Sequence, residues 1–283
     1  MELLPGETQY NITKKELYEN DIDLSVKTRS LLKVLSYNIW DKTDYWEERI
    51  SHVVRIIRDN NPDVCCLLEV SKDCYDFLVD ALEPTYLFFQ VFILENEEAG
   101  MVLLCNKSTV DLPEGTQPYY YDFQTDGRVV GVELELLDNN EKFHVLCTKL
   151  DDHRDNDHIR NEQFSLVNKV IKNLKNCIVA GDFNIFKESE DVESSILTSK
   201  LKDSWTKMGC PTRVKYTFDG KRNRITQDTT QLRATRLYYY GTHLDIKSLS
   251  LIGTSPISEH LPIAPSCHYG LMGIFQCEKM NEY

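Results

Sequence analysis

The sequence predicts an α/β protein in which two β-sheets pack together and helices cover their outer faces. Strand-like and helix-like segments alternate through the first half of the chain, and strand-like segments dominate the second half. This order is typical of a layered α/β fold. No internal repeat or linker is visible, so residues 31–283 are predicted to form one domain after a polar tail or lead-in, residues 1–30.

The first half of the chain shows two periodicities. Residues 31–40 contain a strand whose polar end is Asn38, and the apolar spacing over residues 49–60 predicts an amphipathic helix. The Asn61-Pro62-Asp63 sequence ends that helix. We then expect strands at residues 64–70, 86–94, 100–105, 129–137 and 143–149, a helix at 72–82, and a hairpin turn at 138–141.

The second half begins with a charged loop at residues 151–157. This loop opens a helix from about residue 156 to 174, and a short apolar strand, Cys177 to Ala180, follows it. Beyond that strand we expect a helix at residues 191–201 and strands at 232–240, 244–252 and 269–276.

Polar residues at two strand ends are the first candidates for chemistry. Asp182 and Asn184 follow Gly181 at a spacing that places both side chains on one side of an extended backbone. They suit a divalent metal, a phosphate oxygen or a polarised water, or equally the capping of a strand-to-helix loop. Glu69 ends a buried strand, where a carboxylate is costly unless it is paired, metal-bound or turned to solvent.

Composition limits the class of protein. The formal charge of −13 argues against a non-specific nucleic-acid coat, and no apolar run is long enough to cross a bilayer. The N-terminus lacks a secretory pattern, and nine cysteines without a CxxC pair favour reduced thiols. We therefore expect an intracellular protein, in the nucleus or the cytoplasm, that does not contact membranes.

One segment reverses the overall acidity. Between Lys207 and Arg236 there are eight basic residues and two acidic ones. Basic and aromatic side chains together suit a phosphate backbone with stacked bases, although a solvated basic loop has the same composition. The candidate nucleic-acid contacts are Tyr216, Arg222, Arg233 and Arg236.

Four motifs together resemble the endonuclease/exonuclease/phosphatase superfamily, over roughly residues 31–277. They are Ser36-Tyr37-Asn38-Ile39, Leu68-Glu69-Val70, Gly181-Asp182-Phe183-Asn184 and Ser266-Cys267-His268. The resemblance implies a four-layer, DNase I-like α/β sandwich. Within the superfamily, Asp203-Ser204-Trp205, Tyr216-Thr217-Phe218-Asp219 and the segments 232–239 and 248–253 are most similar to the tyrosyl-DNA phosphodiesterase 2 family.

The resemblance implies a function and a set of roles. Members of that family cut the phosphodiester between a topoisomerase tyrosine and a DNA 5′ end, with Mg²⁺ (or Mn²⁺) and an activated water. By resemblance, Glu69 would bind the metal with help from Asn38, and Asp182 would orient or deprotonate the water. Asn184 would hold a phosphate oxygen, and His268 would stabilise charge in the transition state.

Three positions depart from the family pattern. Lys149 stands where the family has His, and Thr235 and Cys267 each stand where it has Asp. An ammonium still attracts phosphate but exchanges protons poorly near neutral pH. His260, in Ser258-Glu259-His260, is an alternative to His268 as the site histidine.

Two hypotheses follow from the matches and the departures. The first is an active, metal-dependent phosphodiesterase that acts on 5′-blocked nucleic-acid ends or a related phosphoester. The second is a catalytically impaired family member that binds nucleic acid or protein.

Overall fold

A computed structural model of the chain describes residues 31–91, 99–123, 128–187 and 190–277. The predicted tail, residues 1–30, lies outside this described part, as do residues 92–94 of one predicted strand. No helix within the described residues is both long and apolar enough to span a bilayer.

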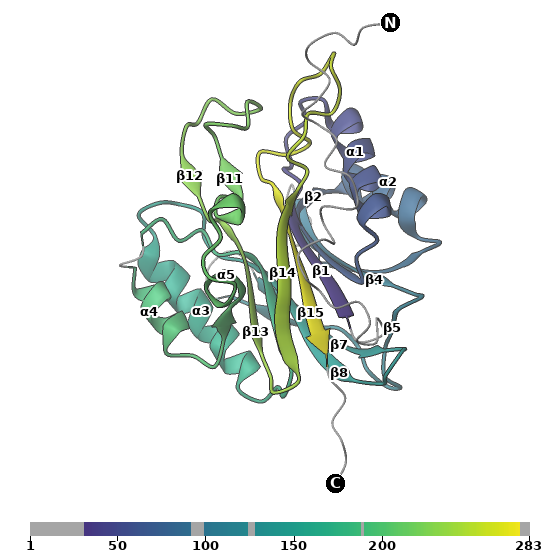
Figure 1. Ribbon diagram of the computed structural model, residues 1–283, viewed down its shortest axis with the longest axis vertical. Helices are drawn as coiled ribbons and strands as arrows, with labels where there is room; N and C mark the ends of the chain where they lie inside the picture. Colours follow the sequence, from purple (N-terminus) through teal and green to yellow (C-terminus); the bar gives the residue numbers. More distant parts are fainter. Residues whose placement is uncertain (1–30, 92–98, 124–127, 188–189, 278–283) are drawn as a thin grey trace, which may run out of the picture.

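Two large mixed sheets form the centre of the molecule (Figure 1). The first has the strands β1 (Leu31–Asn38), β2 (Val64–Ser71), β3 (Tyr86–Val91), β4 (Ala99–Asn106), β14 (Leu244–Ile252) and β15 (Gly270–Cys277). Its order is β14-β15-β1-β2-β4-β3, in which β1 and β2 are parallel and the other neighbours are antiparallel.

The second sheet has seven strands. They are β5 (Val110–Asp111), β6 (Tyr119–Asp122), β7 (Arg128–Leu136), β8 (Lys142–Lys149), β9 (Cys177–Asp182), β10 (Lys202–Asp203) and β13 (Thr235–Tyr240). Its order is β10-β13-β9-β8-β7-β5, with β6 also paired to β7, and only β8 and β9 are parallel. A separate hairpin joins β11 (Phe218–Asp219) to β12 (Gln231–Leu232).

Helices cover both outer faces, which completes the four layers that the sequence predicts. They are α1 (Trp46–Asn60), α2 (Lys72–Leu82), α3 (Asp157–Ile171) and α4 (Asp191–Leu197), while the short helix α5 (Ser204–Lys207) lies against β10, β13 and β14. The apolar side chains of α1 and α2 pack on the first sheet, and those of α3 and α4 pack on the second. A third apolar cluster, which includes Val34, Val132 and Phe275, fills the space between the sheets. The predicted two-sheet sandwich is therefore confirmed.

Most predicted elements occur where the patterns place them, and residues 72–82 and 244–252 agree at both ends. Helix α1 begins at Trp46, three residues earlier than expected, and Glu47 and Glu48 in its first turn favour a helix N-terminus. Helices α3 and α4 end at Ile171 and Leu197, before the predicted residues 174 and 201.

The predicted strand at residues 232–240 is divided in two. Strand β12 ends at Leu232, and β13 begins at Thr235. The backbone N–H of Thr235 donates to the side-chain hydroxyl of Thr217, at 2.9 Å, and Ala234 accepts from the N–H of Phe183. These bonds mark the point at which the chain leaves the hairpin and enters the second sheet.

Candidate active site

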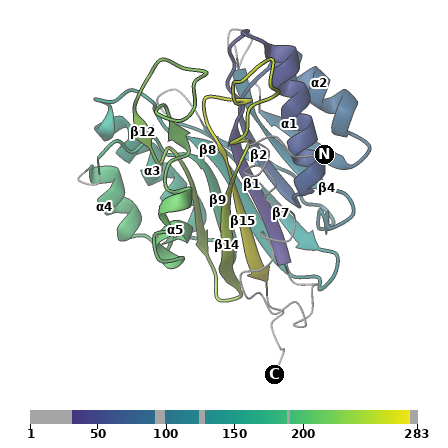
Figure 2. The ribbon, with the colours of Figure 1, turned by 45° about the horizontal axis from the view of Figure 1, so that its top comes forward.

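The ends of strands from both sheets meet at one edge of the sandwich. This edge is the upper end in Figure 1, where the β11–β12 hairpin and the loop before β15 rise above the sheets; Figure 2 shows it turned forward. Asn38 ends β1, Asp182 ends β9 and Lys149 ends β8, while Glu69 lies near the end of β2. Thr235, at the start of β13, is the register partner of Asp182.

Asp182 lies at the centre of the site. Its Oδ2 accepts a hydrogen bond from Asn38 Nδ2 at 2.8 Å, and its Oδ1 accepts one from the Thr235 hydroxyl at 2.6 Å. All three side chains are buried. Two donors from different strands therefore fix the orientation of this carboxylate, which is what a residue that orients a water requires.

Gly181 allows the close approach of strands that positions Asp182. It has φ of 143°, a conformation that residues with a Cβ rarely adopt. A Cβ at this position would lie 1.8 Å from the backbone oxygen of Thr148 in β8. The glycine is thus needed for β9 to lie against β8 where the candidate site begins.

His268 faces Asp182 from the segment before β15. Its Nδ1 lies 3.8 Å from Asp182 Oδ2, which is beyond hydrogen-bond length. This nitrogen is buried, and it has no hydrogen-bond partner among the described residues. A buried polar atom without a partner is uncommon in folded proteins, so its position beside a carboxylate marks a place for a water or a substrate oxygen.

Two contacts hold the His268 ring and backbone. The ring packs edge-on against Phe218, with 5.3 Å between centroids, and the backbone N–H donates to the Ser266 hydroxyl at 3.1 Å. The same hydroxyl donates to the backbone oxygen of Asn38 at 2.6 Å. Ser266 therefore links the segment of His268 to the end of β1. The sequence did not reveal this role, although Ser266 belongs to the Ser266-Cys267-His268 motif.

The amide of Asn38 is oriented from both ends. Its Oδ1 accepts from the N–H of Trp40 at 3.0 Å, and its Nδ2 donates to Asp182. The donor side of the amide thus faces the carboxylates, and the oxygen that a metal would need is engaged by the backbone. This geometry supports an orienting role for Asn38, and the part in metal binding that the resemblance implies stays a prediction.

Glu69 points into the site from a β-bulge. The register between β2 and β4 shifts between Leu68 and Val70, and Glu69 has φ of 54°. Bulges re-aim side chains and are frequent beside active sites. The left-handed conformation thus turns the Glu69 side chain out of the strand alternation.

Lys149 forms an ion pair with Glu69. The Lys149 Nζ lies 3.0 Å from Glu69 Oε1 and 3.0 Å from Asp152 Oδ2. Burial alone would raise the pKa of Glu69, but Lys149, followed by His268 and Asn38, outweighs it and holds this pKa below its usual range. Burial likewise opposes the Lys149 ammonium, yet Glu69 and Asp152 raise its pKa. Both groups are therefore charged at neutral pH.

Cys267 and Asn184 complete the set of predicted residues near Asp182 in the sequence motifs. Burial, reinforced by the charges of Glu69 and Asp182, raises the pKa of the Cys267 thiol, so this position carries no charge at neutral pH. Asn184, with φ of 48°, donates its amide nitrogen to the backbone oxygen of Leu150 at 2.9 Å. One hydrogen of this amide therefore holds the loop after β8, and the phosphate contact that the resemblance implies for Asn184 stays a prediction.

The four predicted nucleic-acid contacts do not form one surface. Arg236 is buried and donates to Glu193 Oε2 at 2.7 Å, and Arg233 donates to Asp203 Oδ2 at 2.7 Å. Arg222 is exposed on the β11–β12 hairpin, close enough to Tyr269 to act electrostatically on its phenol. Tyr216 is half-buried, with the Lys215 ammonium 5.2 Å from its ring centroid.

Two further residues bear on the predicted site. His260, the alternative site histidine, is exposed, whereas His268 lies beside Asp182. Asp152 was not predicted, although its place three residues after Lys149, just beyond a strand end, is a signal that could have identified it. The structure thus brings Asn38, Glu69, Lys149, Asp182 and their neighbours Thr235, Cys267 and His268 together.

The donor set does not fit a divalent metal as it stands. Among the described residues, no group of three or more His, Cys, Asp or Glu side chains could hold a metal ion. Mg²⁺ is usually bound by one or two carboxylates together with substrate phosphates. Here Glu69 is already neutralised by Lys149, Asn38 presents its donor nitrogen, and Cys267 is a neutral thiol.

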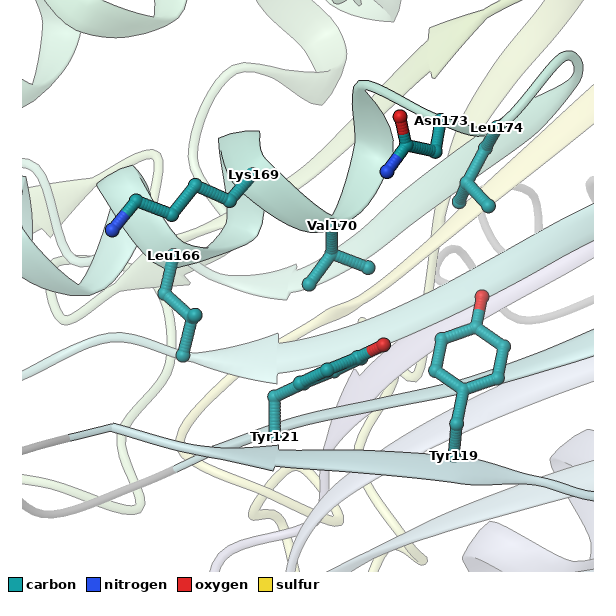
Figure 3. A pocket seen from close by; sticks show the side chains of 7 residues that line it. All are labelled: Tyr119, Tyr121, Leu166, Lys169, Val170, Asn173 and Leu174. Atoms are coloured by element: carbon teal, nitrogen blue, oxygen red, sulfur yellow. The ribbon is translucent and has the colours of Figure 1, made fainter.

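A pocket of about 270 Å³ lies elsewhere, between strand β6 and helix α3 (Figure 3). Tyr119 and Tyr121 face Leu166 and Val170 across it, and Lys169 extends along one side. None of the site residues lines this pocket, so it takes no part in the candidate chemistry.

Known proteins resemble the chain in sequence and in fold. A 5′-tyrosyl-DNA phosphodiesterase of Caenorhabditis briggsae is 26% identical over 256 residues, which cover 86% of this chain and 69% of that protein. The structure of D. rerio TDP2 complexed with a single-strand DNA product superposes with a TM-score of 0.79 at 20% identity, over 87% of this chain and 99% of that one.

Two further structures share the fold. A truncated Caenorhabditis elegans TDP2 has a TM-score of 0.75 at 23% identity, over 87% of this chain and 98% of that one. The human Nocturnin catalytic domain with bound sulfate has a TM-score of 0.68 at 18% identity, over 88% and 94%. Residues 35–243, most of the chain, match the model of the Endonuclease/Exonuclease/phosphatase family. The chain belongs to that family.

Proposed function

We propose that the protein is a phosphodiesterase that hydrolyses an ester at a blocked 5′ end of a nucleic acid, with a tyrosyl adduct as the first substrate to test. One observation supports this most directly: the partnerless, buried Nδ1 of His268 lies 3.8 Å from the doubly anchored carboxylate of Asp182. The similarity to a 5′-tyrosyl-DNA phosphodiesterase supports the choice of substrate.

The chain's own residues suggest how the reaction proceeds. Asp182, held by Asn38 and Thr235, accepts a proton from the water whose oxygen attacks phosphorus. The bond from phosphorus to the tyrosyl oxygen breaks as the new one forms. His268 and Lys149 offset the negative charge that grows on the phosphate oxygens.

A tyrosyl leaving group suits this set of residues. Free tyrosine has a pKa of about 10, so its phenolate leaves with less assistance than an alkoxide. The Mg²⁺ or Mn²⁺ that the resemblance implies would supply further charge neutralisation at Glu69. The ammonium of Lys149, which is paired with Glu69, opposes the binding of such an ion.

The test is release of tyrosine from a 5′-phosphotyrosyl oligonucleotide, with Mg²⁺ in the buffer. Asp182→Ala should lower turnover by about 10²–10⁴-fold, the range expected for a positioned general base. Glu69→Ala should lower it as well, because Lys149 loses its partner. Asp80→Ala, on the exposed side of α2, is the control and should change nothing.

One set of observations favours a second candidate, a catalytically impaired member that binds nucleic acid. Thr235 and Cys267 are uncharged where the family has carboxylates, and Glu69 is neutralised. Oligonucleotide binding without turnover in the wild type would establish this alternative. Turnover that survives Asp182→Ala would contradict both proposals.

A further inference from the structure

Lys149, the last residue of β8, lies between two carboxylates. It is one of the three residues that depart from the family pattern. Lys149 Nζ is 3.0 Å from an oxygen of Glu69 and 3.0 Å from an oxygen of Asp152. Two negatively charged carboxylate oxygens thus converge on one positively charged nitrogen, as they would converge on a bound metal cation. The ammonium thus occupies the point at which these carboxylates would otherwise bind a metal.

Burial and backbone geometry hold the ammonium there. Lys149 lies opposite Asp182 in the parallel pair of β8 and β9, so its position in the strand is fixed by the sheet. The Glu69 side chain is 19% exposed and that of Lys149 is 31% exposed, so water screens their attraction only partly. The bulge at Glu69 turns the carboxylate towards the lysine.

A second cation at this point meets repulsion. A divalent ion that approached Glu69 would lie within a few ångströms of the ammonium, and like charges at that distance repel strongly where water is partly excluded. The other carboxylates are already engaged, Asp152 by the same ammonium and Asp182 by two hydrogen-bond donors, and the Cys267 thiol is neutral.

We propose that Lys149 is a tethered cation that takes the place of the divalent ion at Glu69, so that the site contacts phosphate through an ammonium and binds Mg²⁺ or Mn²⁺ only weakly. This inference rests on the location of the proposed site, but it does not require the site to be active. It predicts that removal of the ammonium creates a cation site from Glu69 and Asp152.

The test measures Mn²⁺ binding to the full chain by water-proton relaxation, without substrate. The wild type should show only weak Mn²⁺ binding that does not involve this site, so Glu69→Gln should leave it unchanged. Lys149→Met should bind Mn²⁺ about tenfold more tightly or better, since it removes a positive charge and frees two carboxylates. The double variant Lys149→Met/Glu69→Gln should lose the gain.

Lys72→Met is the matched control. Lys72 Nζ also lies 3.0 Å from a carboxylate oxygen, that of Asp76, but the pair is exposed and contains a single carboxylate. This variant should show no gain in Mn²⁺ affinity. Circular dichroism checks that each variant is folded, and Lys149→Gln provides a second neutral side chain at the site.

Two results would overturn the inference. One is tight Mn²⁺ binding by the wild type that is lost in Glu69→Gln. This result would show that the metal binds at Glu69 although Lys149 is present. The other is a folded Lys149→Met or Lys149→Gln protein with no gain in affinity. Both results are obtained without substrate. The Mn²⁺-binding test therefore remains valid even if the protein does not cleave the phosphotyrosyl oligonucleotide.

Discussion

At the scale of single residues, the site combines two kinds of neighbour around Asp182. Asn38 donates to the Asp182 carboxylate from an amide, and Thr235 donates to it from a hydroxyl. The hydroxyl of Thr235 fixes the carboxylate without adding a second negative charge. An amide and a hydroxyl therefore orient Asp182 together.

Thr235→Val tests this role. It keeps the shape of the side chain and removes the 2.6 Å hydrogen bond to Asp182 Oδ1. We expect kcat for tyrosine release to fall by about tenfold or more, since a hydrogen bond to a charged group contributes roughly 1.5–3 kcal/mol. Thr198→Val, at an exposed position after α4, is the control. An unchanged kcat in folded Thr235→Val would rule out the orienting role.

At the scale of elements, a buried ion pair joins the two loops that flank the site. Arg160 of α3 donates from Nε and Nη2 to Glu190 Oε2, at 3.0 and 2.9 Å, and from Nη1 to the backbone oxygens of Asp151 and His153. Glu190 Oε1 accepts from the N–H of Phe186. The loop after β8 and the loop after β9 are thereby fixed to the same helix.

Arg160→Met should destabilise the protein by about 3–5 kcal/mol, because it leaves the Glu190 carboxylate buried without its partner. The measurement is urea unfolding at pH 7. Arg55→Met is the control, since the Arg55 pair with Asp59 is exposed and contributes little. Equal stabilities of the two variants would show that the buried pair does not anchor the loops.

The sequence predicted the elements better than the contacts between them. Asn38, Glu69 and Asp182 were predicted because each is a polar residue at the end of an apolar strand, a local pattern. The contact of Lys149 with Asp152 and Glu69 depends on the direction of a loop and on a bulge, which no local pattern encodes. The resemblance implies a metal at Glu69, whereas the ammonium that lies 3.0 Å from this carboxylate could only be found from the structure.

The basic segment shows the same limit. Its composition predicted Arg236 as a nucleic-acid contact, yet the residue is buried against Glu193, which lies 43 residues earlier on another element. Strand β13 is buried at every position from Thr235 to Tyr239, so Arg236 lies inside the fold, and its ion partner was not identifiable from the sequence. Arg222 is exposed and Arg236 is buried, a difference that the composition of the segment did not show.

At the scale of the whole molecule, the chain is acidic, and an exposed arginine lies at the site end. Arg222 is exposed on the hairpin that rises at this end, near Tyr269 and hence near His268 (Figure 1). A net charge of −13 disfavours long-range attraction of a polyanion. Binding should therefore depend on few phosphate contacts.

Arg222→Ala should weaken oligonucleotide binding for all sequences alike and reduce the salt dependence of log K by about 1, the loss of one phosphate contact. Fluorescence anisotropy over a range of NaCl concentrations measures both. Arg58→Ala, in the last turn of α1, is the control. A salt dependence that stays the same in Arg222→Ala would place the nucleic acid elsewhere.

The central claim is that the Asp182 site directs water onto phosphorus. The most direct measurement is cleavage of a 5′-phosphotyrosyl oligonucleotide in water enriched in ¹⁸O, with mass spectrometry of both products. We predict one ¹⁸O atom in the 5′-phosphate, none in the released tyrosine, and about 10²–10⁴-fold slower formation of labelled product with Asp182→Ala. No cleavage by the wild type, or label in the tyrosine, would contradict the account.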